Sequence, residues 1–260
     1  MQSAFQRRAW SRPGPFLAVV FAAGLVGSLV FVGLLLQGQE GPPRAVIVDQ
    51  LSLTHPNPDF IEKATSLLEE AGFTVDYYSG EEANVRLYQN LARRKYAYVI
   101  LRNHSALIPD YRVGSGPLVR GDLGLFTAEP ASQTRYLEEQ RTFRLTFGKY
   151  FDGGPRYFSV GSRLIASSSG DFDDATVVIM GCDGLTSSHM AAAFVEKGAK
   201  AVVGWDGLVS AGHTDAATLK MLRYQLLDQL PVQEATAAAM AELGPDPTFE
   251  SVLLSYPPAR

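Results

Sequence analysis

The stretch ATVVIMGCDGL, residues 175–185, joins a short apolar run to a glycine-rich loop. The run 175–181 consists mainly of β-branched and apolar residues, which predicts a fully buried strand. The strand is expected to break at Gly181, Cys182 and Asp183, and Cys182 is the only cysteine in 260 residues. The chain therefore places its one thiol at the carboxyl end of a buried strand.

Similar apolar runs predict further strands, with helical periodicity between most of them. The strands are expected at 44–50, 73–79, 96–103, 199–205 and 249–257, and the helices at 58–71, 81–95, 185–197, 214–230 and 231–243. Strands that alternate with helices at this spacing are typical of βαβ units. The prediction is an α/β domain with an open, mostly parallel β-sheet and helices on both faces. The stretch 104–174 breaks the alternation and predicts an insertion over the sheet edge, with a hairpin-like piece at 157–166.

A long apolar segment, residues 16–36, stands near the start of the chain and contains no charged residue. At about 1.5 Å per residue, a helix over this segment would span roughly the 30 Å core of a bilayer. Three arginines precede it, which favours a cytoplasmic N-terminus (1–15), a transmembrane helix (16–36), a linker (37–43) and an extracytoplasmic domain (44–260). A cleaved signal peptide is the alternative, but its apolar part is usually shorter, and no A-x-A-like site follows. The sequence thus predicts a single-pass membrane protein that contacts lipid through residues 16–36.

Composition excludes some functions. The chain has 23 basic and 27 acidic residues and no basic cluster, so nucleic-acid binding is not expected. A lone cysteine cannot form an intrachain disulfide, and a free thiol outside the cytoplasm tends to oxidise, which favours a functional role for Cys182. The sequence has no Walker loop, no G-x-G-x-x-G, no G-x-S-x-G and no recognised metal-ligand spacing. Neither a cofactor nor a metal is expected.

Ligands of open parallel sheets bind beyond the carboxyl ends of the strands. In this sequence those ends carry Asp49, His104, Cys182 and Asp206. If the strands before His104 and Cys182 are neighbours, the imidazole and the thiol face one crevice. A nucleophilic thiol needs a base, which His104 could be, or a positive environment, which the N-terminus of the next helix could supply. Backbone N–H groups of Ser105 and Cys182 could stabilise an oxyanion.

Each of these residues also has a plainer interpretation. A lone cysteine at a strand end is most often a small buried residue, and a lone histidine after a strand is most often a loop or packed residue. His55, in LTHPNP, is interpreted as a turn residue, and Thr214 as the cap of the helix that follows it. The joint occurrence of His104 and Cys182 on short loops after apolar strands favours a catalytic pair.

The segments YAYVILRNHSA (96–106) and ATVVIMGCDGL resemble the strand–His–Gly and strand–Ala–Cys motifs of the clan CD cysteine peptidases, which include the caspases, legumains and gingipains. In order of elements the resemblance covers roughly residues 44–256. It implies a caspase-like fold with His104 as the catalytic histidine and Cys182 as the nucleophile. Two positions depart from the family pattern, because Ser105 stands for its glycine and Gly181 for its alanine.

The resemblance implies a membrane-anchored cysteine endopeptidase that acts on a peptide or protein substrate. Two alternatives stay open: a non-catalytic caspase-like receptor or assembly module, and a transpeptidase with the same dyad. In caspase-like folds, strand ends around the nucleophile form the pocket for the residue before the cut, and here they carry Asp206, Asp49 and Asp183. A carboxylate pairs well with Arg or Lys, so cleavage after a basic residue is expected, with Asp206 as the first candidate for the pocket floor. The alternative is that all three are solvated loop or helix-start residues.

Overall fold

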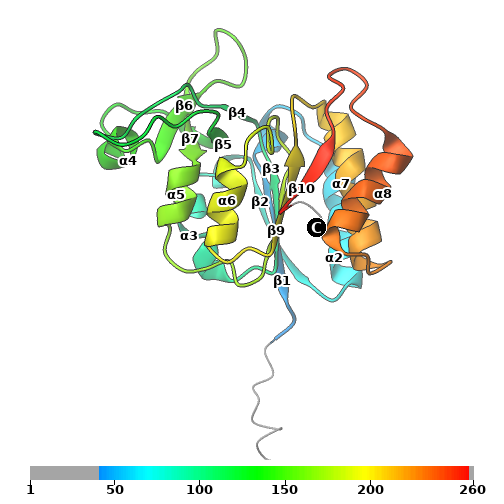
Figure 1. Cartoon of the computed structure of the whole chain (residues 1–260). Helices are drawn as coiled ribbons and strands as arrows, with labels where there is room; N and C mark the ends of the chain where they lie inside the picture. Colours follow the sequence, from blue (N-terminus) through cyan, green and yellow to red (C-terminus); the bar gives the residue numbers. More distant parts are fainter. Residues whose placement is uncertain (1–40, 258–260) are drawn as a thin grey trace, which may run out of the picture. The chain divides into compact units, whose positions relative to one another are not determined.

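The central sheet has six strands in the order β10-β9-β8-β3-β1-β2 (Figure 1). The computed structural model describes residues 41–257. The strands of this sheet are β1 (Arg44–Asp49), β2 (Thr74–Ser79), β3 (Tyr98–Arg102), β8 (Thr176–Ile179), β9 (Ala201–Trp205) and β10 (Leu253–Tyr256). Five of them are parallel, and β10 pairs antiparallel with β9. The predicted α/β class with a mostly parallel sheet is confirmed for this part of the chain.

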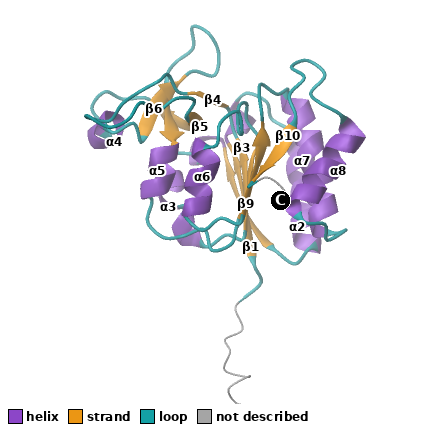
Figure 2. Ribbon diagram, viewed as in Figure 1, coloured by secondary structure: helices purple, strands orange, loops and turns teal. Residues whose placement is uncertain are grey.

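Helices cover both faces of this sheet (Figure 2). One face carries α2 (Pro58–Glu70), α7 (Ala211–Leu226) and α8 (Val232–Leu243), and the other carries α3 (Val85–Asn90), α5 (Ser162–Ser167) and α6 (His189–Glu196). Side chains of a strand alternate between the two faces. In β1, Val46 and Val48 join one core cluster, and Ala45 and Ile47 join the other. Apolar runs without alternation therefore form strands that are buried on both sides.

The predicted insertion contains a second sheet of its own. Its strands are β4 (Ser105–Leu107), β5 (Leu123–Pro130), β6 (Leu145–Gly148) and β7 (Tyr157–Gly161), in the antiparallel order β4-β5-β7-β6, with α4 (Leu137–Arg141) beside them. The hairpin predicted at 157–166 is wrong, because β7 runs directly into α5. The adjacent residues Leu164 and Ile165 belong to the same core cluster, which a helix allows, whereas a strand would place them on opposite faces.

Three predicted helices have different bounds. The helix expected at 81–95 is broken into η2 (Gly80–Glu82), α3 and η3 (Ala92–Arg94), because Asn84 caps a new helix by accepting a hydrogen bond from the N–H of Leu87. The helix expected from 185 begins only at His189, after a run of turns. Thr214 is not a cap, because α7 already begins at Ala211. A short η1 (Gln50–Leu53) follows β1.

Within residues 41–257, the structure contains no helix with the length and apolar character that a membrane crossing requires. Residues 16–36, where the anchor is predicted, lie outside the described residues.

Candidate active site

His104 and Cys182 line one cavity of about 560 Å³ beyond the carboxyl ends of β3 and β8. These two strands are adjacent and parallel, as the shared crevice requires. Leu101 of β3 pairs with Ile179 of β8. His104 lies three positions after Leu101, and Cys182 lies three positions after Ile179. The register of the sheet therefore brings the imidazole and the thiol to the same cavity. Its other lining residues are Leu51, His55, Asn103, Met180, Gly181, Val209, Ser210, Ala211, Gly212, Thr214, Thr248 and Phe249.

Burial keeps both members of the pair uncharged. Desolvation raises the pKa of the Cys182 thiol. Its Sγ donates a hydrogen bond to the carbonyl oxygen of Val209 at 3.8 Å. Desolvation, and to a smaller extent His55, lowers the pKa of His104 to about 4. At neutral pH the pair consists of a thiol and a neutral imidazole. The helix N-terminus expected to favour a thiolate is not adjacent, since α6 begins seven positions later at His189.

The surroundings of His104 include residues that sequence reasoning missed. Its Nε2 is 2.9 Å from Oγ1 of Thr54, and its backbone N–H donates to Oε1 of Gln50 at 2.9 Å. Its ring stacks on Tyr150 at 5.4 Å between centroids. Thr54 and Gln50 follow the carboxyl end of β1, so the strand-end rule could have included them. Tyr150 lies in the insertion, where no sequence signal pointed to the site.

Ser105 and Cys182, the two predicted oxyanion residues, are joined directly. Oγ of Ser105 donates a hydrogen bond to the carbonyl oxygen of Cys182 at 2.5 Å. The neighbouring Gly181 has no room for a side chain, since a Cβ there would stand within 3.0 Å of Oγ of Ser105 and of the carbonyl oxygen of Asn103. This contact fixes the loop after β3 to the loop after β8. The role of the two backbone N–H groups stays a prediction.

Asp49 is an interior ion-pair partner. Its side chain is 1% exposed, and its Oδ1 accepts a hydrogen bond from Nη1 of Arg102 at 2.7 Å. Arg102 also forms a two-pronged pair with Asp215, with both N···O distances at 2.8 Å. The hydroxyl of Tyr77 donates to the second oxygen of Asp49. The expectation that Asp49 receives a substrate cation needs correction, because Arg102 already neutralises this carboxylate in the interior.

Asp183 and Asp206 hold loops together. Asp183, in the left-handed region with φ 60°, accepts a hydrogen bond from the hydroxyl of Thr186 at 2.9 Å. The exposed Asp206 accepts one from the N–H of Val252 at 2.7 Å. Neither side chain lines the cavity of His104 and Cys182, and no carboxylate is among its lining residues. The geometry therefore gives the expected basic specificity no support at this cavity.

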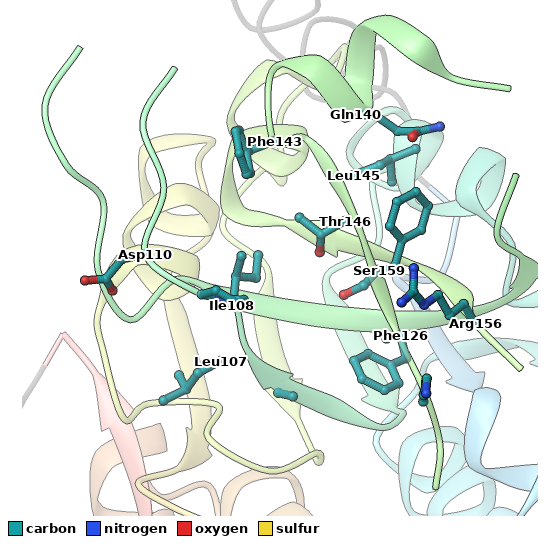
Figure 3. A pocket seen from close by; sticks show the side chains of 15 residues that line it. Leu107, Ile108, Asp110, Phe126, Gln140, Phe143, Leu145, Thr146, Arg156 and Ser159 are labelled. Carbon is teal, nitrogen blue, oxygen red and sulfur yellow. The ribbon is translucent and has the colours of Figure 1, made fainter. Parts of the chain in front are cut away.

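A larger cavity, of about 740 Å³, lies on the antiparallel sheet of the insertion (Figure 3). Its walls are mainly apolar, with Leu107, Phe126 and Phe143 among them, and Arg156 also lines it. Phe126 links it to the candidate site, since its ring centroid is 6.3 Å from that of His104. This cavity holds no thiol or imidazole, so it offers no nucleophile of this type.

The comparisons with known proteins add no family. No family model matches the chain, and no curated protein matches it. Within residues 41–257, no group of three or more His, Cys, Asp or Glu side chains is arranged to hold a metal ion. The chemistry of the candidate site therefore rests on His104, Cys182 and their neighbours.

Proposed function

We propose that the protein is a cysteine endopeptidase in which Cys182 is the nucleophile and His104 the general base. The observation that carries the proposal is their convergence on one cavity from equivalent positions after adjacent parallel strands. A mixed, mostly parallel sheet with helices on both faces is compatible with the caspase-like fold that the motifs resemble. This placement beyond the carboxyl strand ends is also where ligands of such sheets bind.

The electrostatics of the pair define the sequence of proton movements. Because burial disfavours both the thiolate and the imidazolium, the proton moves as the sulfur attacks rather than before. Sγ of Cys182 bonds to the peptide carbonyl carbon, and His104 takes the S–H proton. The C–N bond then breaks, the amine leaves with that proton, and a thioester remains on Cys182. Water, activated by His104, hydrolyses the thioester and restores the thiol.

One observation favours a second candidate, a non-catalytic caspase-like module. A pair that rests as neutral thiol and neutral imidazole is less reactive than an ion pair, and a binding module needs no reactive thiol. The transpeptidase alternative shares the acylation step and differs in the acceptor, which is an amine in place of water. A reactive thiol would therefore distinguish either enzyme from the non-catalytic module. The preferred acceptor, water or an amine, would then distinguish the peptidase from the transpeptidase.

The test is covalent labelling of Cys182 by a peptide carrying an electrophilic ketone. The peptidase proposal expects labelling of the wild type and loss of labelling in His104→Ala. The exposed His189 offers a matched control, and His189→Ala should be labelled like the wild type. Peptides that the wild type cleaves should not be cleaved by the Cys182→Ala variant. Absence of labelling in the wild type, or equal cleavage by Cys182→Ala, would rule out the mechanism.

We also propose that the domain is held at a membrane by residues 16–36 as a single uncleaved span, with the domain outside the cytoplasm. The support is the length of the apolar segment and the arginines before it. Protease added to intact cells should remove the domain and leave a small membrane-bound fragment. Full protection in intact cells, with digestion only after lysis, would reverse the orientation. Release of the whole domain into the medium would indicate cleavage instead.

A further inference from the structure

A second histidine is connected to His104 through one hydroxyl group. Oγ1 of Thr54 lies 2.9 Å from Nε2 of His104 and 3.0 Å from Nδ1 of His55. The two rings are arranged edge to face, with centroids 5.7 Å apart. A hydroxyl has one proton to donate and lone pairs that accept, so it can receive an N–H from one imidazole and donate O–H to the other. The three side chains thus form a continuous hydrogen-bonded chain.

The two ends of this chain differ in exposure. His104 is half-buried, whereas His55 is exposed at the rim of the cavity. Water stabilises a charged imidazole far better than a partly apolar interior does. The ring of His104 lies against the rings of Tyr150, Phe126 and His55. Thr54 and Gln50 form hydrogen bonds with His104, and the thiol of Cys182 lines the same cavity. None of these groups carries a negative charge at neutral pH. A positive charge is therefore better placed on His55 than on His104.

Backbone hydrogen bonds hold the loop that carries Thr54 and His55. The backbone N–H groups of both residues donate to the carbonyl oxygen of Leu51, at 3.0 and 2.6 Å. The carbonyl oxygen of His55 accepts a hydrogen bond from Nη2 of Arg102 at 2.9 Å. Arg102 is itself held by the buried carboxylates of Asp49 and Asp215, so the charges beneath His55 are one guanidinium and two carboxylates paired with it. The geometry of the chain is therefore built into the fold.

We propose that Thr54 and His55 form a proton relay that carries the proton of the Cys182 thiol through His104 to an exposed imidazole. The inference rests on the proposed peptidase function and deepens it. As Sγ attacks, its proton passes to Nδ1 of His104, the Nε2 proton of His104 passes to Oγ1 of Thr54, and the hydroxyl proton passes to Nδ1 of His55. The positive charge then resides on His55 and the negative charge on the tetrahedral oxyanion. When the C–N bond breaks, the same protons move back and the amine leaves protonated.

The relay can be tested without a known substrate, by following alkylation of Cys182 with iodoacetamide from pH 5 to 9. Thr54→Val keeps the shape of the side chain and removes the hydroxyl, and His55→Gln removes the second imidazole. Each should slow alkylation at neutral pH by about tenfold. The double variant should be no slower than either single variant, because both interrupt one chain. The exposed His189→Gln is the matched control and should behave like the wild type.

The pH dependence of the alkylation rate distinguishes a proton relay from a purely structural role of Thr54 and His55. In the wild type, alkylation should fall at acid pH in step with protonation of His55, followed by NMR, since a protonated His55 cannot accept. In His55→Gln this part of the profile should disappear. If His104→Ala slows alkylation but both relay variants match the wild type, the relay is wrong and the dyad stands. If His104→Ala also matches the wild type, the dyad itself is wrong.

Discussion

Oγ of Ser105 lies within 3.0 Å of the point where a Cβ at Gly181 would stand. At these two positions the sequence differs from the clan CD motifs that it was expected to resemble, with serine for glycine and glycine for alanine. The departures are physically linked, since the side chain after His104 fills the space beside the residue before Cys182. The serine also gains a hydrogen bond to the carbonyl oxygen of Cys182. The contact between Ser105 and Gly181 thus joins the two loops that carry His104 and Cys182.

The first prediction follows from this contact. Gly181→Ala should lower the free energy of unfolding by about 1–3 kcal/mol, because the methyl group overpacks the contact between the loops. Adding Ser105→Gly should restore only part of the loss, since the backbone carbonyl oxygen of Asn103 also stands within 3.0 Å of the new Cβ. Urea unfolding of the single and double variants measures both effects. Gly212→Ala is the control, because nothing lies within 4 Å of its Cβ position, and it should cost nothing. If Gly181→Ala were as stable as the wild type, the space beside Ser105 would not be too small for a methyl group.

The second prediction concerns the buried ion network. Arg102→Met should destabilise the domain by about 3–5 kcal/mol, because it leaves the carboxylates of Asp49 and Asp215 buried without their partner. Arg120→Met removes an arginine from an exposed pair with Asp110 and should cost less than about 1 kcal/mol. Both values come from urea unfolding at pH 7. Similar losses for the two variants would show that the network contributes no more than a surface pair.

The third prediction concerns the residue before the cleaved bond. The lining of the cavity of His104 and Cys182 includes the apolar residues Leu51, Met180 and Val209 and contains no carboxylate. Burying a guanidinium or ammonium there without a partner costs several kcal/mol. A positional peptide library should therefore show preference for an uncharged side chain at this position, and Asp206→Asn should not change it.

Adding a carboxylate to the wall of this cavity should create a preference for a basic side chain. Val209→Asp places a carboxylate in the wall of the cavity and should shift the library preference toward Arg or Lys. A preference for Arg or Lys in the wild type that is lost in Asp206→Asn would restore the expectation drawn from the sequence. It would also show that the substrate side chain occupies another part of the surface.

The fourth prediction concerns acid stability. His104 has a pKa of about 4 in the folded protein, against an ordinary value of 6.5, because burial disfavours its charged form. Between these two values the unfolded chain binds more protons than the folded one, so the stability of the fold falls as the pH decreases from 6.5 to 4. His104→Gln removes this titrating group and should give a flatter dependence of the unfolding free energy on pH. Urea unfolding at pH 7, 5.5 and 4.5 measures it, and identical slopes for wild type and variant would contradict the assignment.

The sequence alone determined the α/β alternation, most strands of the central sheet and the positions of His104 and Cys182. Continuous apolar runs specify strands that are buried on both faces, and this information is local. Parallel neighbours bring their carboxyl ends to one edge. The sequence made the shared crevice conditional on the two strands being neighbours, and the structure supplies that pairing of β3 with β8.

The tertiary structure decided the environment of that pair. Arg102 lies 53 positions from Asp49 and 113 from Asp215. The pairing of β1 with β3 sets Arg102 opposite Asp49, and α7 brings Asp215 to the same guanidinium. The loop after β1 places Thr54 and His55 beside His104, although the sequence marked His55 only as a turn residue. The insertion supplies Tyr150 in the same way. These contacts join residues far apart in the chain, and local hydrophobic periodicity contains no information about which distant polar groups will meet.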